Sequence, residues 1–329
     1  MPPYDRAVNE FELIARFFTR PPHSRSVVLG VGDDAALLAP TPGHVVVAAV
    51  DMLVGGRHFY PDADPETIGH KALAVNLSDI AAMGATPKWA LLALALPDSD
   101  PAWLAAFARG LLALADEHAV ELVGGDTTRG PLNLCVTILG EIPAGEAITR
   151  AGARVGDDIY VSGELGDAAL AVAARAGRIA LDAAAMYACC ARLDRPTPRL
   201  ALGARLRGVA NAMLDVSDGL TGDLGHILDA SAVGAVIDLD SIPHSPVLAA
   251  RLAGTDRALG RQCLLAGGDD YELCFTATPA ASAQIAAIAR EVHVPLTRIG
   301  EVVAGRGLTV RDEQGAAIEL PRAYDHFAP

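Results

Sequence analysis

The stretch HKALAVNLSDIAAMGATPKWALLALAL, residues 70–96, places an apolar helical pattern directly before an apolar strand pattern. The two patterns predict a helix over residues 65–83 and a strand over residues 89–96. Helical and strand-like segments continue to alternate on both sides of this stretch. The alternation indicates an α/β protein with mixed α+β layers.

The other expected elements form two series along the chain. In the first series we predict helices over residues 10–18 and 101–118 and strands over residues 26–29, 45–50, 120–123 and 133–140. In the second series we predict helical segments across residues 167–206, a helix near Asp218, and strands over residues 158–161, 235–238, 272–276, 297–300 and 308–310. Residues 141–156, rich in Gly, Pro and Ala, separate the series and predict two domains, residues 1–150 and 151–329. A GGD turn in each half hints that the domains are related.

The charge and cysteine content exclude several classes of protein. The 329 residues carry 40 acidic against 26 basic side chains, a formal charge of −14, which disfavours nucleic acid and anionic membranes as partners. The five cysteines are odd in number and include no CxxC pair, so neither a disulfide framework nor a zinc site is expected. The N-terminus lacks the apolar core of a signal peptide, and no apolar run is long enough to span a bilayer. We therefore expect a cytoplasmic protein.

Six places repeat one local pattern, an apolar run that ends in a turn bearing aspartate. The turns carry Asp33, Asp34, Asp51, Asp79, Asp126, Asp215, Asp218, Asp269 and Asp270. A carboxylate at the end of a buried strand lies on the rim of a sheet, where ligands of α/β proteins bind. Carboxylates that converge there repel one another unless cations neutralise them, and hard oxygen ligands select Mg²⁺. The pattern predicts a Mg²⁺ site, with glycines that let backbone N–H groups approach a phosphate.

Aspartate also caps helices and forms turns, so a local role competes with ligand binding at each position. We assign that local role to Asp33, Asp167, Asp223 and Asp270. The remaining aspartates form a constellation that local roles alone do not explain.

Phosphate binding cannot use the common lysine-containing loops. The sequence has neither a Walker-type P-loop nor the protein-kinase signature set, so metals, backbone amides and arginines must contact phosphates. Arg129 and Arg150 are the candidate arginines, and each is otherwise a solvent-facing side chain. Ser217 could donate its hydroxyl to a phosphate, cap the following helix, or do both. His58 follows a Gly-Gly turn near the acidic residues, and Lys71 is either a partner of that acidic face or a surface lysine.

The motifs GVGDDAAL, HKALAVNLSDIAAMGATP, GGDTTRGP, LDVSDGL with DLGHI, GGDDYELCF and YDHFA follow one another along the chain. In this order and spacing they resemble the thiamine-monophosphate kinase family over essentially the whole chain. NLSDIAAMGA and the GGD turns are shared with a wider superfamily that includes aminoimidazole ribonucleotide synthetase and selenide water dikinase. VSDGL, GGDDYEL and YDHF narrow the resemblance to the thiamine-phosphate enzyme.

The resemblance implies an aminoimidazole ribonucleotide synthetase-like fold of two α/β domains and a homodimer joined through the N-terminal domains. It implies transfer of the γ-phosphoryl group of ATP to thiamine monophosphate, giving thiamine diphosphate. The residues that match Mg²⁺ ligands are Asp34, Asp51, Asp79, Asp126, Asp215 and Asp218, and we expect Asp79, Asp126 and Asp218 to be catalytic. The residues that match nucleotide contacts are Gly125, Asp126, Arg150 and Ser217, and those that match substrate contacts are His58, Asp269 and Tyr324.

Two departures from the family pattern concern the site. The family has Ser-Thr where this chain has Ala49-Val50 before Asp51, which removes two potential oxygen ligands. The usual glutamate of a GGED motif is Asp269 here, one methylene shorter. The metal shell at Asp51 and the reach of Asp269 to the substrate are the points where this chain would differ from its relatives.

The acceptor explains why the site needs cations. A phosphate monoester has a second pKa of about 6 and is mostly a dianion at neutral pH, so it needs no general base. The obstacle is charge neutralisation and alignment, and we predict direct in-line transfer with several Mg²⁺ ions and no phosphoenzyme. Two alternatives stay open: another superfamily activity, such as ATP-dependent ring closure in purine synthesis, and a non-catalytic regulator that binds Mg²⁺-nucleotide. Selenide water dikinase is disfavoured, because that enzyme has a reactive cysteine near its N-terminus. The first cysteine of this chain is Cys135, so the reactive cysteine has no counterpart here.

Overall fold

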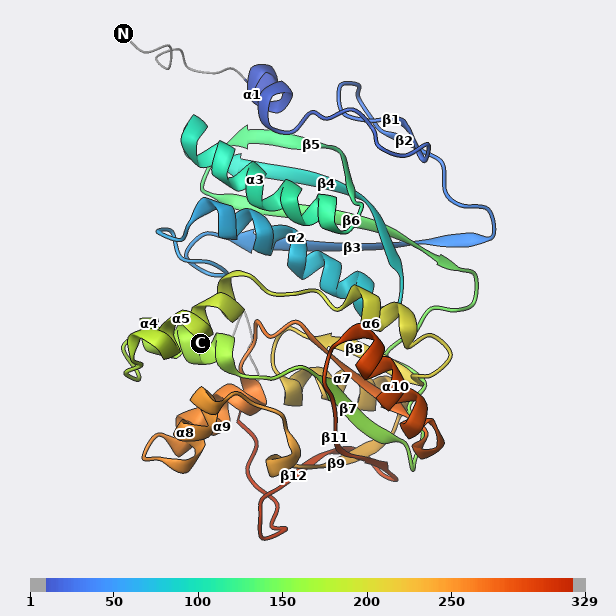
Figure 1. Cartoon of the computed structure of the whole chain (residues 1–329), viewed down its shortest axis with the longest axis vertical. Helices are drawn as coiled ribbons and strands as arrows, with labels where there is room; N and C mark the ends of the chain where they lie inside the picture. The colour runs from blue at the N-terminus through green and yellow to red at the C-terminus, as the bar shows by residue number, and fades with distance from the viewer. Residues whose placement is uncertain (1–9, 322–329) are drawn as a thin grey trace. The chain divides into compact units, whose positions relative to one another are not determined.

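The computed structural model describes residues 10–321, which form two units (Figure 1). Unit 1 contains residues 10–80 and 86–144, and unit 2 contains residues 81–85 and 145–321. No helix within residues 10–321 is both long and apolar enough to cross a membrane.

Unit 1 is built on a mixed sheet of four strands in the order β3-β6-β4-β5, in which only the β4–β5 pair is parallel. Its elements are α1 (Glu10–Phe17), β1 (Val27–Leu29), β2 (Leu37–Leu38), β3 (His44–Val54), α2 (Pro65–Ala82), β4 (Thr86–Leu96), α3 (Pro101–Glu117), β5 (Glu121–Arg129) and β6 (Asn133–Pro143). Figure 1 shows α2 and α3 running across the same sheet.

The two faces of the unit 1 sheet are buried to different degrees. Alternate residues such as Leu92, Leu134 and Ile138 are at most 5 % exposed, because they form the apolar core with the helices. On the opposite face, β1 and β2 cover part of the sheet, and the outer strand β3 leaves Val50 and Met52 60 % and 55 % exposed. The open part of the sheet is therefore apolar.

Two glycines set the close approach of α2 and α3. A Cβ atom on Gly69 would collide with the Phe107 carbonyl, and one on Gly110 would collide with the Glu66 carbonyl. Each helix thus presents a glycine where the backbone of the other crosses it. The crossing fixes the N-terminal half of α2 against α3.

Unit 2 is built on a six-stranded sheet in the order β12-β9-β11-β7-β10-β8, antiparallel except for the β12–β9 pair. Its strands are β7 (Asp158–Ser162), β8 (Ala212–Val216), β9 (Gly234–Asp238), β10 (Glu272–Ala277), β11 (Leu296–Val303) and β12 (Gly307–Arg311). Its helices are α4 (Asp167–Arg175), α5 (Ala183–Asp194), α6 (Leu200–Arg205), α7 (Leu220–Ser231), η1 (Leu239–Ser241), α8 (Pro246–Ala253), α9 (Arg257–Ala266), η2 (Pro279–Ala281) and α10 (Ser282–Val292). Every residue of β7, β8 and β10 is buried, so these strands form the core.

The mixed α/β class is confirmed, but one structural expectation was wrong. Asp51 and Asp126 do not follow strands; they lie within β3 and β5. The ladder between β3 and β6 runs from His44 to Val54 and so passes through Asp51, where the expected strand stopped. A polar residue does not end a strand, because only alternate residues of a strand face the core. Asp79 likewise lies in the last turn of α2, and Asp215 lies within β8. The helices α8, α9 and α10 were not predicted.

Candidate functional site

The acidic turn of unit 2 begins inside the sheet. Asp215 is the penultimate residue of β8 and is 7 % exposed. Ser217 and Asp218 follow the strand, where Ser217 is half-buried and Asp218 is exposed. Gly219, with φ of 117°, then allows the chain to enter α7.

Asp223, one turn into α7, organises this acidic turn. Its Oδ2 accepts hydrogen bonds from the N–H groups of Ser217, Asp218 and Gly219, each at 3.0 Å. Burial raises the pKa of Asp223 to about 7, against the opposing effect of these N–H donors and with a further rise from the charges of Asp215 and Asp218. The amides that could have held a phosphate at the N-terminus of α7 are therefore bonded to the chain's own carboxylate.

A second turn, residues 267–271, lies against the first. The N–H of Asp269 donates to the Ser217 carbonyl and the N–H of Tyr271 donates to the Val216 carbonyl, both at 2.8 Å. A Cβ atom on Gly268 would lie 2.5 Å from the Ser217 carbonyl oxygen, so this glycine allows the two turns to approach. The structure thus brings Asp269 next to Ser217 and Asp218, residues about fifty positions earlier in the chain.

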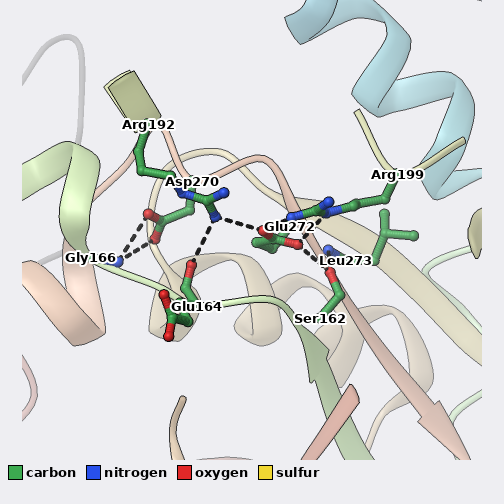
Figure 2. A network of polar contacts seen from close by, with 8 residues as sticks. All are labelled: Ser162, Glu164, Gly166, Arg192, Arg199, Asp270, Glu272 and Leu273. Atoms are coloured by element: carbon green, nitrogen blue, oxygen red, sulfur yellow. Dashed lines mark hydrogen bonds and ion pairs between the residues drawn. The ribbon is translucent and has the colours of Figure 1, made fainter. Parts of the chain in front are cut away.

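Two buried carboxylates, Asp270 within the second turn and Glu272 directly after it, bond the turn to other parts of unit 2 (Figure 2). Asp270 accepts the Gly166 N–H at 2.9 and 3.0 Å through its two oxygens, and Glu272 is bonded to Arg192, Arg199 and Ser162. Burial raises the pKa of Asp270 well above its ordinary value. Sequence reasoning gave Asp270 a local role and missed Glu272. The only signal for Glu272 was a charged residue opening an apolar strand.

In unit 1, Asp51 is tied to α2. Its N–H donates to Asn76 Oδ1 at 3.0 Å, and Asn76 is fully buried, with its amide donating to the Ala72 carbonyl. Asp79 follows Asn76 by three residues, about one helical turn. Asn76 therefore joins α2 to β3 at Asp51, a contact that sequence reasoning missed, although a polar side chain inside an apolar helix is a visible signal.

Side chains alternate between the two faces of β3, so Ala49 and Val50 do not both lie on the face that carries Asp51. Ala49 and Asp51 point to one side of β3, whereas Val50 points to the other and is 60 % exposed. A hydroxyl at position 50 would face away from the Asp51 carboxylate. Of the two positions, 49 and 50, the side chain at position 49 is the one on the same face as Asp51, so the Ala49 substitution is the one that removes a possible oxygen ligand beside Asp51.

Asp126 lies on β5, the strand at the opposite edge of the same sheet from β3. It follows Gly125, whose φ of 151° and contact with the Leu92 carbonyl exclude a side chain. Asp51 is on β3 and Asp126 is on β5, with β6 and β4 between them. Three strand spacings of about 4.8 Å separate their main chains by roughly 14 Å, so one ion cannot bind both.

His58 has a fixed ring orientation. The Val54 N–H donates to its Nδ1 at 2.9 Å, so Nδ1 is an acceptor and a neutral ring carries its proton on Nε2. The turn that holds it, residues 55–59, follows β3 directly. His58 and Asp51 therefore lie at the same end of β3.

The other predicted residues are more scattered. Asp34 is exposed in the loop between β1 and β2, and Arg150 is exposed in the segment that precedes β7. Arg129 donates to the Pro97 carbonyl at 3.3 Å. Lys71 is only 3 % exposed, so the interpretation as a surface lysine was wrong. Tyr324 lies outside the described residues.

Few protein side chains are available together to hold a Mg²⁺ ion in the part of the chain that the structure describes. Within residues 10–321, no three His, Cys, Asp or Glu side chains come close enough to hold a metal ion by themselves. Mg²⁺ is commonly held by one or two carboxylates together with substrate phosphates and water. Asp218, exposed at the turn after β8, is accessible for a role of that kind, whereas Asp215 is 7 % exposed.

Both units of the chain match known domain families. Residues 32–142 match the description AIR synthase related protein, N-terminal domain, and residues 154–313 match AIR synthase related protein, C-terminal domain. A thiamine-monophosphate kinase from Escherichia coli is 46 % identical over 98 % of this chain and 99 % of its own length. The chain belongs to the thiamine-monophosphate kinase family.

Solved structures agree with this membership. A crystal structure of thiamine-monophosphate kinase from Stenotrophomonas maltophilia is 47 % identical, with a TM-score of 0.85, over 94 % of this chain and 98 % of that one. A structure described as AaThiL complexed with AMPPCP and TMP is 30 % identical, with a TM-score of 0.75, over 88 % of this chain and 89 % of that one. The two-domain AIR synthase-like fold and the expectation of an enzyme of the kinase class are confirmed.

Proposed function

We propose that the protein transfers the γ-phosphoryl group of ATP to thiamine monophosphate, giving thiamine diphosphate. The observation that carries the proposal is the likeness to thiamine-monophosphate kinases at 45 % and 46 % identity over 98 % of the chain. A relative described as bound to AMPPCP and TMP supports the pairing of an ATP-like nucleotide with this acceptor.

The proposed metal ligands are carboxylates from both units. Asp34, Asp51, Asp79, Asp126, Asp215 and Asp218 would hold Mg²⁺, with Asp79, Asp126 and Asp218 as the catalytic residues. Bound Mg²⁺ would neutralise the charge on the phosphates that react. The roughly 14 Å between β3 and β5 supports more than one ion.

The chain's own residues would bind and align the two substrates. Gly125, Asp126, Arg150 and Ser217 are the proposed nucleotide contacts, and His58, Asp269 and Tyr324 are the proposed acceptor contacts. Because the N–H groups of residues 217–219 are bonded to Asp223, we assign the nucleotide contact of this turn to the Ser217 hydroxyl. Transfer is direct and in line, with no phosphorylated residue, since the acceptor is already a dianion.

The domains divide this work. We propose that residues 1–150 carry most of the Mg²⁺-nucleotide aspartates and that residues 151–329 complete the nucleotide and substrate site. The cytoplasm is the proposed compartment, supported by five cysteines that are all unpaired.

A second copy of this chain is the proposed partner of the open unit 1 sheet. Val46, Val50 and Met52 follow one face of β3 and are 48 %, 60 % and 55 % exposed. Exposed apolar sheet faces favour association, and a two-fold axis would pair this face with itself. The proposal is a homodimer joined through the N-terminal domains.

The test is ADP release on adding one acceptor at a time to the protein with ATP and Mg²⁺. Release with thiamine monophosphate alone, and not with free thiamine or formylglycinamidine ribonucleotide, supports the proposal. Release with formylglycinamidine ribonucleotide would indicate ring closure in purine synthesis. No release with any acceptor would indicate a nucleotide-binding regulator.

A further inference from the structure

The turn that carries Asp269 has an unfavourable backbone. Asp269 and Tyr271 have φ of 71° and 51°, and these are two of five residues other than glycine with positive φ in residues 10–321. Side chains with a Cβ atom disfavour this region, so such a conformation persists only where the surroundings impose it. The conformation directs Asp269 and Asp270 differently, since Asp269 is half-buried and Asp270 is buried.

Hydrogen bonds hold the main chain of the turn on both sides of Asp270. Asp269 and Tyr271 donate their N–H groups to the carbonyls of Ser217 and Val216, and Asp270 binds the Gly166 N–H. The Tyr271 hydroxyl also bonds to Asp269 Oδ1 at 3.2 Å. These bonds set where the main chain of the turn lies against residues 216–217.

Glu272, the first residue after the turn, is held by its side chain. The side chain is 1 % exposed, and its carboxylate accepts from Arg192 Nη2 at 2.7 Å and from Arg199 Nε at 2.7 Å, with a further bond from Arg199 Nη2. Ser162 donates its hydroxyl to Glu272 at 2.5 Å and accepts the Leu273 N–H at 2.8 Å. Figure 2 shows the two guanidinium groups meeting this one carboxylate.

These partners come from separate elements of unit 2. Arg192 lies in α5, Arg199 immediately precedes α6, and Ser162 ends β7. Arg192 also donates to the Glu164 carbonyl at 3.3 Å. The Glu272 carboxylate is 1 % exposed, whereas the Arg192 and Arg199 side chains are 34 % and 14 % exposed. Burying a carboxylate is costly, and in some proteins a buried ionic group of this kind serves to fix one specific geometry.

We propose that Glu272, clamped by Arg192 and Arg199, is a positioning residue for the acceptor substrate. The clamp imposes the strained turn and so presents the Asp269 carboxylate, three residues earlier, to thiamine monophosphate. This inference rests on the proposed function, in which Asp269 contacts that substrate. In this inference Glu272, Arg192 and Arg199 act on the acceptor substrate only through the position of Asp269.

The test compares Glu272→Gln with Glu141→Gln. Glu141 is the matched control because it is also buried, at 3 % exposure, and accepts hydrogen bonds from Thr41, but it lies in unit 1. Each variant keeps the shape of its side chain and loses one buried charge. Steady-state KM for thiamine monophosphate, KM for ATP, kcat and the unfolding midpoint are measured for both variants.

For Glu272→Gln we expect KM for thiamine monophosphate to rise about tenfold, which corresponds to about 1.4 kcal/mol, with KM for ATP changing less than about twofold. Glu141→Gln should change the two KM values equally or not at all, even where its unfolding midpoint falls as far. Equal changes in both KM values of Glu272→Gln, or no change in either, would overturn the inference.

Ser162→Ala is the second variant, used if Glu272→Gln does not fold. It removes a hydroxyl from the clamp without leaving an unpaired charge, and it should raise KM for thiamine monophosphate about threefold while sparing KM for ATP. An unchanged KM for thiamine monophosphate in a folded Ser162→Ala protein would count against the clamp. A wild-type protein that releases no ADP with thiamine monophosphate would overturn the proposed function itself, which separates that failure from failure of the clamp alone.

Discussion

At the residue scale, the carboxylate of Asp223 occupies the position that a bound phosphate has at many helix N-termini. Three successive N–H groups converge on one of its oxygens. Such a nest binds anions because its N–H dipoles point at one place. Here the anion is internal, so the turn carrying Ser217 and Asp218 is shaped before any ligand arrives.

Replacing Asp223 tests this role. Asp223→Ala leaves three N–H groups without their acceptor and should lower the free energy of unfolding by about 3 kcal/mol, whereas Asp223→Asn keeps an acceptor oxygen and should lose less. Urea unfolding of the two variants measures the difference. Equal losses in both variants would show that the charge matters and not the hydrogen-bond acceptor.

Asp79 is the residue on which the proposed chemistry depends most. Asp79→Asn removes a charge with little change of shape and should lower kcat at least about a thousandfold, with the unfolding midpoint nearly unchanged. Asp33→Asn is the control, because Asp33 is exposed and bonds only locally, to the Asp34 N–H at 2.8 Å. Near-normal turnover of Asp79→Asn would remove Asp79 from the metal site.

At the element scale, glycines decide how closely backbones approach. Gly110 in α3 faces the Glu66 carbonyl at the crossing with α2, whereas Gly225 in α7 has open space around it. Both are helical glycines, so the same substitution has opposite consequences at the two positions. The difference comes from tertiary contact and not from helix propensity.

The substitutions Gly110→Ala and Gly225→Ala measure how much tertiary contact, as opposed to helix propensity, decides the effect of a methyl group at each position. Gly110→Ala should lower the free energy of unfolding by about 1–3 kcal/mol, because a methyl group forces α2 and α3 apart. Gly225→Ala should raise it by about 0.5–1 kcal/mol, because alanine is the better helix former. Denaturant unfolding gives both values, and a loss of stability in both variants would contradict the assignment of open space to Gly225.

At the scale of the whole molecule, the open unit 1 sheet decides the expected assembly. Its outer strand β3 is 11 residues long and exposes apolar side chains along one face. An uncovered strand edge and an apolar face together favour pairing with another copy.

Val50→Lys tests the assembly. A lysine there would place a charge in the proposed interface and on the face of β3 opposite to Asp51, so we expect the mass in solution to fall from two chains to one. Val155→Lys is the control, because Val155 is equally exposed, at 60 %, but lies in unit 2. Light scattering after gel filtration measures the mass, and an unchanged dimer in Val50→Lys would place the interface elsewhere.

Much of this architecture could be predicted from periodicity and motifs, and the errors have a physical cause. The helix over residues 65–83 and the strand over residues 89–96 are present as α2 and β4, because long apolar segments with clear periods depend mainly on local sequence. Asp51 and Asp126 were assigned to strand ends because the apolar runs stop there. Strands β3 and β5 nevertheless continue, because their partner strands continue the ladder.

The sequence by itself determined the family, the α/β class and which residue types could meet a phosphate and a cation, because those depend on motifs and side-chain chemistry. Only the tertiary structure decided that Asp269 lies against Ser217, that Asp223 uses the amides of the acidic turn, and that Glu272 meets two arginines. These are contacts between residues far apart in the chain or between a side chain and a distant backbone. Their existence depends on how the elements pack, which no local pattern of residues specifies.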